Sequence, residues 1–259
     1  MPSLEALTQG VEAELRRLEG SRPLWPLPYC QDSPEAAYRF LTECVRTRIE
    51  KTGEARAIPD KEYIRWVVHE WWGCKKTGRH LIIWKSRRLV LSWIMRALDV
   101  WDIGITPGDV MMGARVYEGK GGAKEFVWRC WYIYDQLAQS FPNWNLKEPL
   151  TEGNVLKGEI DKLVLPNGGV VIAVNSERDS FKGGGARRAV TEELGDYRQV
   201  NEIWSQAMFV TQGPTSEDGM PTGEIGGHAV AISNTSPNTE FKNLKQKAGG
   251  KHDRNTDAD

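Results

Sequence analysis

A strand, a basic turn and a helix follow one another in Leu81-Ile82-Ile83-Trp84-Lys85-Ser86-Arg87-Arg88-Leu89-Val90-Leu91-Ser92-Trp93. The first four residues form a short apolar run that predicts a buried strand, and a helical pattern of apolar residues begins at Leu89. A turn of this kind directs backbone N–H groups and the positive end of a helix dipole toward one point. The stretch therefore predicts a phosphate-binding turn in an α/β protein.

Four consecutive residues of the turn and one hydroxyl on the helix are the candidate nucleotide ligands: Lys85, Ser86, Arg87, Arg88 and Ser92. Lys85, Arg87 and Arg88 add positive charge to the turn, and Ser92 has the hydroxyl that ligates magnesium in phosphate loops. The standard G-x-x-x-x-G-K-[ST] pattern is missing, because this stretch contains no glycine. For the turn taken alone, the alternative interpretation is a strand end with solvated basic residues.

Composition narrows the class of protein. The chain has 259 residues, 40% hydrophobic and 27% charged, which suits a globular protein with a substantial core. Its formal net charge of −1 argues against a strongly basic nucleic-acid coat, so any DNA contact must come from local patches. The four cysteines form no C-x-x-C pair, which argues against zinc and a disulfide framework. No apolar run reaches bilayer length and no signal-peptide pattern opens the chain, so we expect a soluble intracellular protein.

The apolar pattern predicts strands that alternate with helices, which indicates a mainly parallel sheet covered on both faces. Helices are predicted over 3–19, 34–50, 60–72, 88–101, 121–140 and 199–210, and strands over 80–84, 110–114, 186–192 and 228–233. Two apolar runs around an Asn-Gly turn predict a hairpin over 162–173. We expect three parts: an N-terminal helical lid over 1–59, a core over 60–241, and a polar tail or start of a linker over 242–259.

Two adjacent glutamates, Glu192 and Glu193, end the predicted strand 186–192. Ligands of α/β sheets bind in the crevice outside the carboxyl ends of the strands, where both side chains can point. Phosphoryl chemistry needs one carboxylate for hydrated magnesium and another for the attacking water. The pattern predicts the metal role for Glu192 and the water role for Glu193; the alternative is an ordinary acidic loop.

A third element is Ala229-Val230-Ala231-Ile232-Ser233-Asn234-Thr235-Ser236-Pro237, an apolar strand that runs into a polar turn. At such a position Asn234 or Thr235 could hydrogen-bond a γ-phosphate or the attacking water. The alternative interpretation is a strand followed by a turn without a ligand.

The three elements, in this order, resemble the ATPase domain of the large terminase subunit, the DNA-packaging motor of tailed phages and related viruses. The segment Lys85 to Ser92 resembles that family's variant phosphate loop, in which the lysine stands early. The glycine-rich and basic approach 180–188, followed by the two glutamates, resembles the family's Walker B region, and 232–237 resembles its coupling motif. The resemblance covers residues 60–245.

This resemblance implies a P-loop NTPase (RecA/ASCE-like) three-layer fold with a mainly parallel central sheet and an N-terminal helical lid. It also implies an ATPase with ATP and Mg²⁺ as cofactors, which couples hydrolysis to the translocation of double-stranded DNA into the procapsid. The expected protein partners are the portal protein and the small terminase subunit, with a homo-oligomeric ring on the portal and no membrane partner. The expected location is the host cell cytoplasm.

Residue roles follow from the same resemblance. Lys85 and the loop amides would hold the β- and γ-phosphates, while Ser92 and Glu192 place the metal. Arg87 or Arg88 would stabilise transition-state charge in cis, and Arg178 could instead serve a neighbouring subunit. The alternative for Arg178 is a surface charge beside Asp179. Val90 stands where the family usually has glycine, and Glu192 stands where it usually has aspartate. The family's C-terminal nuclease domain has no counterpart after the coupling motif, so we expect the motor half alone.

Contact with DNA phosphates is expected from basic residues near the glutamates and in the tail: Lys182, Arg187, Arg188 and the lysines of 242–251. Two other interpretations stay open. One is another P-loop DNA translocase, such as a helicase-like enzyme. The other is a catalytically weak or silent nucleotide-binding module that acts in assembly.

Overall fold

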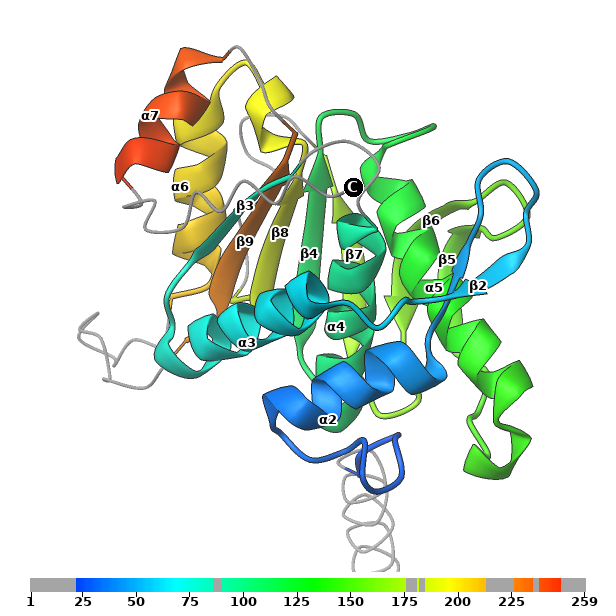
Figure 1. Ribbon diagram of the computed structural model, residues 1–259. Coiled ribbons are helices and arrows are strands. Elements are labelled where there is room, and N and C mark those ends of the chain that lie inside the picture. Colours follow the sequence, from blue (N-terminus) through cyan, green and yellow to red (C-terminus); the bar gives the residue numbers. More distant parts are fainter. Residues whose placement is uncertain are drawn as a thin grey trace, which may run out of the picture.

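The computed structural model of the chain describes residues 22–85, 90–175, 181, 185–212, 226–234 and 238–247. Its centre is a seven-stranded sheet with the strand order β3-β9-β8-β4-β7-β6-β5 (Figure 1). The first five strands in this order run parallel, β6 is antiparallel to β7, and β5 is antiparallel to β6. The bounds are β3 Leu81–Trp84, β4 Asp109–Ala114, β5 Leu150–Asn154, β6 Glu159–Val164, β7 Val170–Val174, β8 Arg188–Glu192 and β9 His228–Ser233. The mainly parallel sheet and the 162–173 hairpin are confirmed.

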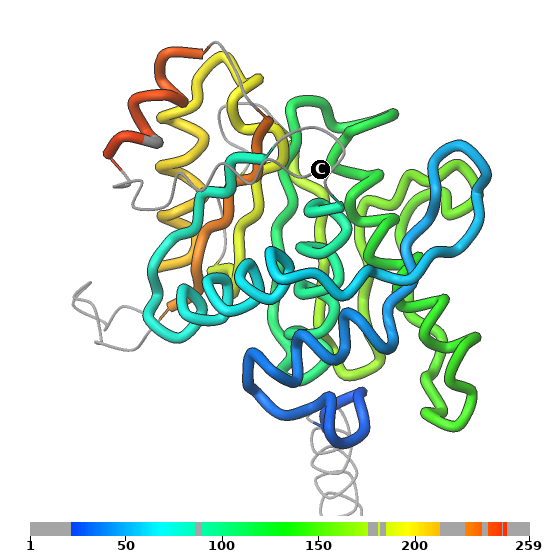
Figure 2. The backbone as a smooth tube through the Cα atoms, viewed as in Figure 1, coloured from blue at the N-terminus to red at the C-terminus, as the bar shows by residue number. Residues whose placement is uncertain are grey.

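Helices cover both faces of this sheet, as Figure 2 shows along the backbone trace. Their bounds are α2 Pro34–Arg39, α3 Glu62–Thr77, α4 Leu91–Ile105, α5 Ala123–Ser140, α6 Val200–Val210 and α7 Thr239–Lys247. Short helical turns lie at η1 Phe40–Cys44, η2 Pro142–Trp144 and η3 Leu194–Asp196. Among the described residues, none of the helices combines the length and apolar character that crossing a bilayer needs.

Strand β9 shows how the two faces are built. Val230 and Ile232 belong to the core formed with α2, α3, α4 and α5, whereas Ala229 and Ala231 belong to the core formed with α6 and α7. Successive side chains of a strand point to opposite faces, so this alternation requires apolar cover on both sides. The near-continuous apolar run of β9 is the pattern expected of such a strand.

The N-terminal half of the predicted helix 34–50 is confirmed, but its C-terminal half is wrong. Helical structure ends at Cys44, and β1 Arg46–Arg48 then pairs antiparallel with β2 Ala55–Ala57. The reversal depends on Gly53, which has a φ of 75° and whose N–H donates to the carbonyl of Ile49. Glycine adopts this left-handed conformation without steric cost, so the chain turns back there instead of continuing as a helix.

The described start of the predicted polar tail belongs to the helix α7, which continues to Lys247. Asn238 caps this helix: its Oδ1 accepts from the N–H of Glu240 at 2.9 Å and of Phe241 at 3.3 Å. Phe241 is fully buried, with its ring centroid 5.4 Å from that of Trp84. One buried aromatic side chain and a good cap therefore anchor an otherwise polar helix. Residues 248–259 and the predicted helix 3–19 lie outside the described residues.

The described residues before the predicted boundary at 59 share a core with α4. The indole of Trp25 donates to the carbonyl of Trp101 at 2.9 Å, and the N–H of Leu24 donates to the carbonyl of Gly104 at 2.7 Å. Trp25 is also buried against Phe40, with ring centroids 5.1 Å apart. The three-part division of the chain stays a prediction.

Candidate active site

Three adjacent parallel strands, β3, β9 and β8, end at the same edge of the sheet, the upper edge in Figure 1. The residues that follow them are Lys85 after β3, Asn234 after β9 and Glu193 after β8, while Glu192 is the last residue of β8. The first turn of α4 brings Ser92 to the same place. Strand β9 lies between the strand of the lysine and the strand of the glutamates. The topology thus brings together five of the predicted site residues.

Both the backbone and the side chain of Lys85 are held by neighbouring residues. Its N–H donates to the carbonyl of Ser233 at 2.9 Å, which extends the β3–β9 pairing by one residue. Its Nζ donates to Oδ1 of Asn234 at 3.3 Å and lies 3.8 Å from Oε1 of Glu193. Only 8% of the residue is exposed, so the ammonium group lies among carboxylate and amide oxygens with little access to bulk water.

Glu193 adopts a conformation that is unusual for a residue with a side chain. Its φ and ψ are 54° and 40°, in the left-handed region, and it directly precedes the turn η3. The Nδ2 group of Asn234 donates to both carboxylate oxygens, each at 2.8 Å. The hydroxyl of Ser233 accepts from the N–H of Gly195 at 3.0 Å, which ties the turn to the end of β9. The carboxylate is thus held over the end of β9 by a neighbouring strand.

Glu192 lies deeper, with 1% of the residue exposed. The hydroxyl of Ser92 donates to Oε2 at 3.1 Å, and Nη1 of Arg96 donates to Oε1 at 3.2 Å. Burial raises the pKa of this carboxyl group, while the charges of Arg96 and Lys85 act in the opposite direction; the raising effect is the larger one. Its two oxygens therefore have different partners, one a hydroxyl and the other a guanidinium.

A chain of buried charges continues from Glu192 along the interface of α4 and β8. Nε of Arg96 donates to Oδ2 of Asp99 at 3.0 Å, and Nη1 of Arg188 donates to Oδ1 of Asp99 at 2.5 Å. Nη2 of Arg188 donates to Asp102 at 2.6 Å. Burial acts to raise the pKa of Asp102, but Arg188 and the neighbouring cations outweigh it and lower that pKa.

The expectation that Arg188 contacts DNA is wrong, because its side chain is completely buried. Arg188 and Glu192 are four residues apart on one strand, so both point to the face that α4 covers. The side chain of Arg187, on the same strand approach, is 28% exposed and donates to Asp102 at 3.0 Å. It too is already paired with an acid.

The predictions of site residues did not include Arg96 and Asp99. A signal exists in the sequence, because Arg96, Asp99 and Asp102 interrupt an otherwise apolar helix at three-residue intervals. Residues at this spacing lie near one another on a helix, and charged residues within an apolar surface imply buried partners. The partners themselves come from a strand about 90 positions later, as the separation of Arg188 from Asp99 shows.

Several predicted site residues lie outside the described residues: Ser86, Arg87, Arg88, Arg178, Lys182 and Thr235. Their roles stay predictions. Val90 is described and has a φ of −72°, so the turn does not use the left-handed conformation there. A β-branched residue at the usual glycine position is consequently free of backbone strain.

The residues of the site fit a magnesium ion. Oε2 of Glu192 and the hydroxyl of Ser92 are adjacent oxygen atoms, and Mg²⁺ prefers oxygen ligands. Arg96 bonds to Oε1, whereas Oε2 accepts from the hydroxyl of Ser92, so both of these oxygen atoms would face an ion once that hydroxyl proton turned away. Within the described part of the chain, no three His, Cys, Asp or Glu residues group as metal ligands. A Mg²⁺ ion here would take its other ligands from phosphate and water, as is usual for this ion.

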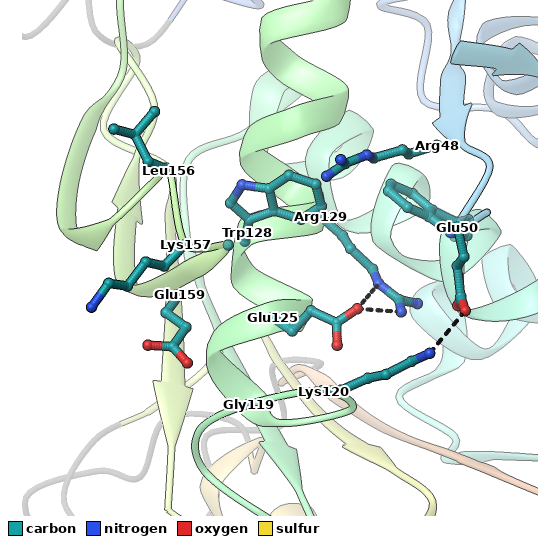
Figure 3. A pocket seen from close by; sticks show the side chains of 12 residues that line it. Arg48, Glu50, Gly119, Lys120, Glu125, Trp128, Arg129, Leu156, Lys157 and Glu159 are labelled. Atoms are coloured by element: carbon teal, nitrogen blue, oxygen red, sulfur yellow. Dashed lines mark hydrogen bonds and ion pairs between the residues drawn. The ribbon is translucent and has the colours of Figure 1, made fainter. Parts of the chain in front are cut away.

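A separate cleft of ≈ 360 Å³ lies among α5, the loop before it, and the turn between β5 and β6 (Figure 3). Trp128 forms its wall, with the guanidinium of Arg48 5.5 Å from the ring centroid. Lys120 pairs with Glu50 at 3.3 Å and Arg129 pairs with Glu125 at 2.6 Å. The cleft contains none of the predicted site residues.

No protein-family model matches the chain, and no curated protein matches it. Among solved structures, the large terminase of bacteriophage HK97 is similar, with a TM-score of 0.47 and 14% sequence identity. The match covers 77% of this chain and 37% of that chain. This chain therefore spans little more than a third of the length of the terminase that it matches.

Proposed function

We propose that the chain is the ATP-hydrolysing motor domain of a viral DNA-packaging terminase large subunit. The observation that carries the proposal is the convergence of Lys85, Ser92, Glu192, Glu193 and Asn234 at one edge of three parallel strands. These residues come from three separate segments of the sequence that resemble terminase motifs. A common site for residues so far apart in sequence is what a nucleotide-hydrolysing centre requires.

In this proposal the chain's own residues divide the work. Lys85 and the N-terminus of α4, which no side chain caps among the described residues, attract the phosphate oxygens. Bound Mg²⁺ would supply charge neutralisation of the phosphates. Ser92 and Glu192 present oxygen ligands to it, and Asn234 orients the carboxylate of Glu193. Glu193 then accepts a proton from the attacking water.

We propose double-stranded DNA, the portal protein and the small terminase subunit as partners, with a homo-oligomeric ring assembled on the portal in the host cytoplasm. Of the predicted DNA contacts that the structure describes, Lys242 and Lys247 on α7 are exposed. A motor must grip any sequence through its phosphates, so DNA affinity should fall steeply as salt rises. Binding that is insensitive to salt would contradict the phosphate-contact part of this proposal.

The proposal is tested with Lys85→Ala and Glu193→Gln in the assembled motor. Loss of the lysine should weaken nucleotide binding, whereas the glutamine should leave binding in place and reduce kcat by about 10²–10⁴-fold, the usual contribution of a general base. Lys51→Ala is the matched control, since this lysine is exposed in the turn between β1 and β2 and belongs to no part of the proposed site. Undiminished hydrolysis in both site variants would refute the assignments.

One observation favours a second candidate, a nucleotide-binding assembly module with weak or no turnover. Asn234 occupies both oxygens of Glu193 and Lys85 contacts both residues, so the polar groups of the site satisfy one another. Titration of a fluorescent ATP analogue with and without Mg²⁺, beside a phosphate-release assay, separates the two. Tight Mg²⁺-dependent binding without phosphate release in the assembled motor would favour the silent module.

A further inference from the structure

Arg96 lies one helical turn after Ser92 on α4 and faces the end of β8. The residue is completely buried. Its guanidinium uses two different nitrogens for two different acids, Nη1 for Oε1 of Glu192 at 3.2 Å and Nε for Oδ2 of Asp99 at 3.0 Å. A planar guanidinium has its donors in fixed directions, so the two bonds together define where the carboxylate of Glu192 lies.

The second acid is itself fixed from the strand that bears Glu192. Oδ1 of Asp99 accepts from Nη1 of Arg188 at 2.5 Å, and Arg188 lies four residues before Glu192 on β8. The contacts form a closed ring that leaves β8 at Arg188, passes through Asp99 and Arg96, and returns to β8 at Glu192. Such a ring fixes the position of α4 along β8, and with it the distance between Ser92 and Glu192.

From this geometry we infer that Arg96 is a positioning residue for Glu192, an inference that rests on the proposed function. It holds Oε1 and so keeps Oε2 beside the hydroxyl of Ser92, where a divalent ion would bind. Arg96 is fully buried beneath this pair and acts through Glu192 without touching the nucleotide.

Stability alone gives a weak reason for this arrangement. Replacing a buried ion pair by well-packed apolar residues is often neutral or stabilising, because the desolvation of both charges offsets their attraction. Replacing a residue that orients a metal ligand acts on metal binding instead, and commonly lowers metal affinity by about 10–100-fold. The two roles predict different results for metal binding.

The experiment measures Mn²⁺ affinity by water-proton relaxation in the full chain saturated with a non-hydrolysable ATP analogue. The variants are Arg96→Met, Arg96→Lys, Glu192→Gln and the combination of each Arg96 change with Glu192→Gln. Urea denaturation establishes which variants are folded, and Arg96→Lys provides the test if the methionine variant is not. The matched control is Arg129→Lys, because Arg129 is also buried but bonds to Glu125.

Arg96→Lys should weaken Mn²⁺ binding about 10-fold, because an ammonium group cannot reproduce the fixed geometry with which the guanidinium donates to both Glu192 and Asp99. Arg129→Lys should leave it unchanged. Because Arg96 acts through Glu192, its replacement should have no further effect in the Glu192→Gln background. Two results would overturn this inference and leave the proposed function in place. One is a folded Arg96→Lys chain with normal Mn²⁺ affinity, and the other is an equal loss of Mn²⁺ affinity with and without Glu192→Gln. Absence of Mn²⁺–nucleotide binding by the unmodified chain would instead remove the proposed function, and this inference with it.

Discussion

The side-chain amide of Asn234 donates to both carboxylate oxygens of Glu193, each at 2.8 Å, although the two residues are 41 positions apart. One residue follows β9 and the other follows β8, so the contact links the ends of two neighbouring strands. Oδ1 of the same amide accepts from Lys85, which follows β3. One asparagine therefore connects the three strand ends that make up the candidate site.

If the proposed ATPase activity is correct, Asn234→Ala should lower its kcat by roughly 10- to 100-fold, because a hydrogen bond to a charged group contributes about 1.5–3 kcal/mol. The measurement is steady-state phosphate release, with Asn143→Ala as the control at an exposed position outside the site. A rise in kcat would contradict the prediction and identify the contact as a restraint on Glu193.

The left-handed conformation of Glu193 leads to a prediction about stability. Glycine has no Cβ to clash in this region, whereas other residues pay roughly 1–2 kcal/mol there. Both Glu193→Gly and Glu193→Ala remove the carboxylate, so their difference reports the backbone alone. The glycine variant should be the more stable by roughly 1 kcal/mol in urea denaturation.

The control for this comparison is Glu70, which lies within the helix α3. There the order should reverse, because glycine in a helix interior is about 1 kcal/mol less favourable than alanine. If alanine were also the better residue at position 193, the left-handed turn after β8 would be wrong.

The sequence predicted the strand ends well because each depends on a short local run. Apolar segments at 81–84 and 228–233 are followed at once by polar residues, and parallel strands bring such ends to one edge. The burial of Arg188 against an acid of α4 could not be predicted in the same way. Whether a strand residue meets solvent or an acid depends on which helix covers that face, and Asp99 comes from a helix 89 positions earlier.

Two further elements were missed for related reasons. The helix α7 is mostly polar, and its order depends on a contact between Phe241 and Trp84 that only the folded chain creates. The β1–β2 hairpin has few apolar residues, so its pairing leaves little trace in periodicity. Local patterns reveal elements with a strong apolar face, while elements held by one or two distant contacts escape them.

The contact of Trp25 with Gly104 on α4 gives a third prediction. A Cβ added at Gly104 would lie 2.3 Å from Cζ2 of Trp25, a buried ring that cannot move freely. Gly104→Ala should therefore destabilise the chain by about 1–3 kcal/mol through overpacking. The control is Gly73→Ala in α3, where a Cβ would meet nothing within 4 Å and should stabilise the helix by about 0.5–1 kcal/mol. If Gly104→Ala and Gly73→Ala had equal effects on stability in urea denaturation, Trp25 would not pack on α4.

The last prediction concerns pH and the other end of β8 and β9. His228 is almost completely buried, and its Nε2 accepts from Nε of Arg188 at 3.3 Å. Burial, reinforced by the charge of Arg188, lowers the pKa of this imidazole well below its usual value. The unfolded chain binds a proton near pH 6.5 that the folded chain does not accept, so the folded state loses stability as pH falls below that value.

At pH 5.5, one unit below the unfolded pKa, the contribution of His228 should lower the free energy of unfolding by about 1.4 kcal/mol relative to pH 7.5. Burial also lowers the pKa of His80, whose Nδ1 accepts from the N–H of Ala229, so part of the loss should persist in His228→Asn. The measurement is urea denaturation at both pH values. A His228→Asn chain with the same dependence as the unmodified protein would show that His228 is charged in the fold, and hence that Arg188 does not face it.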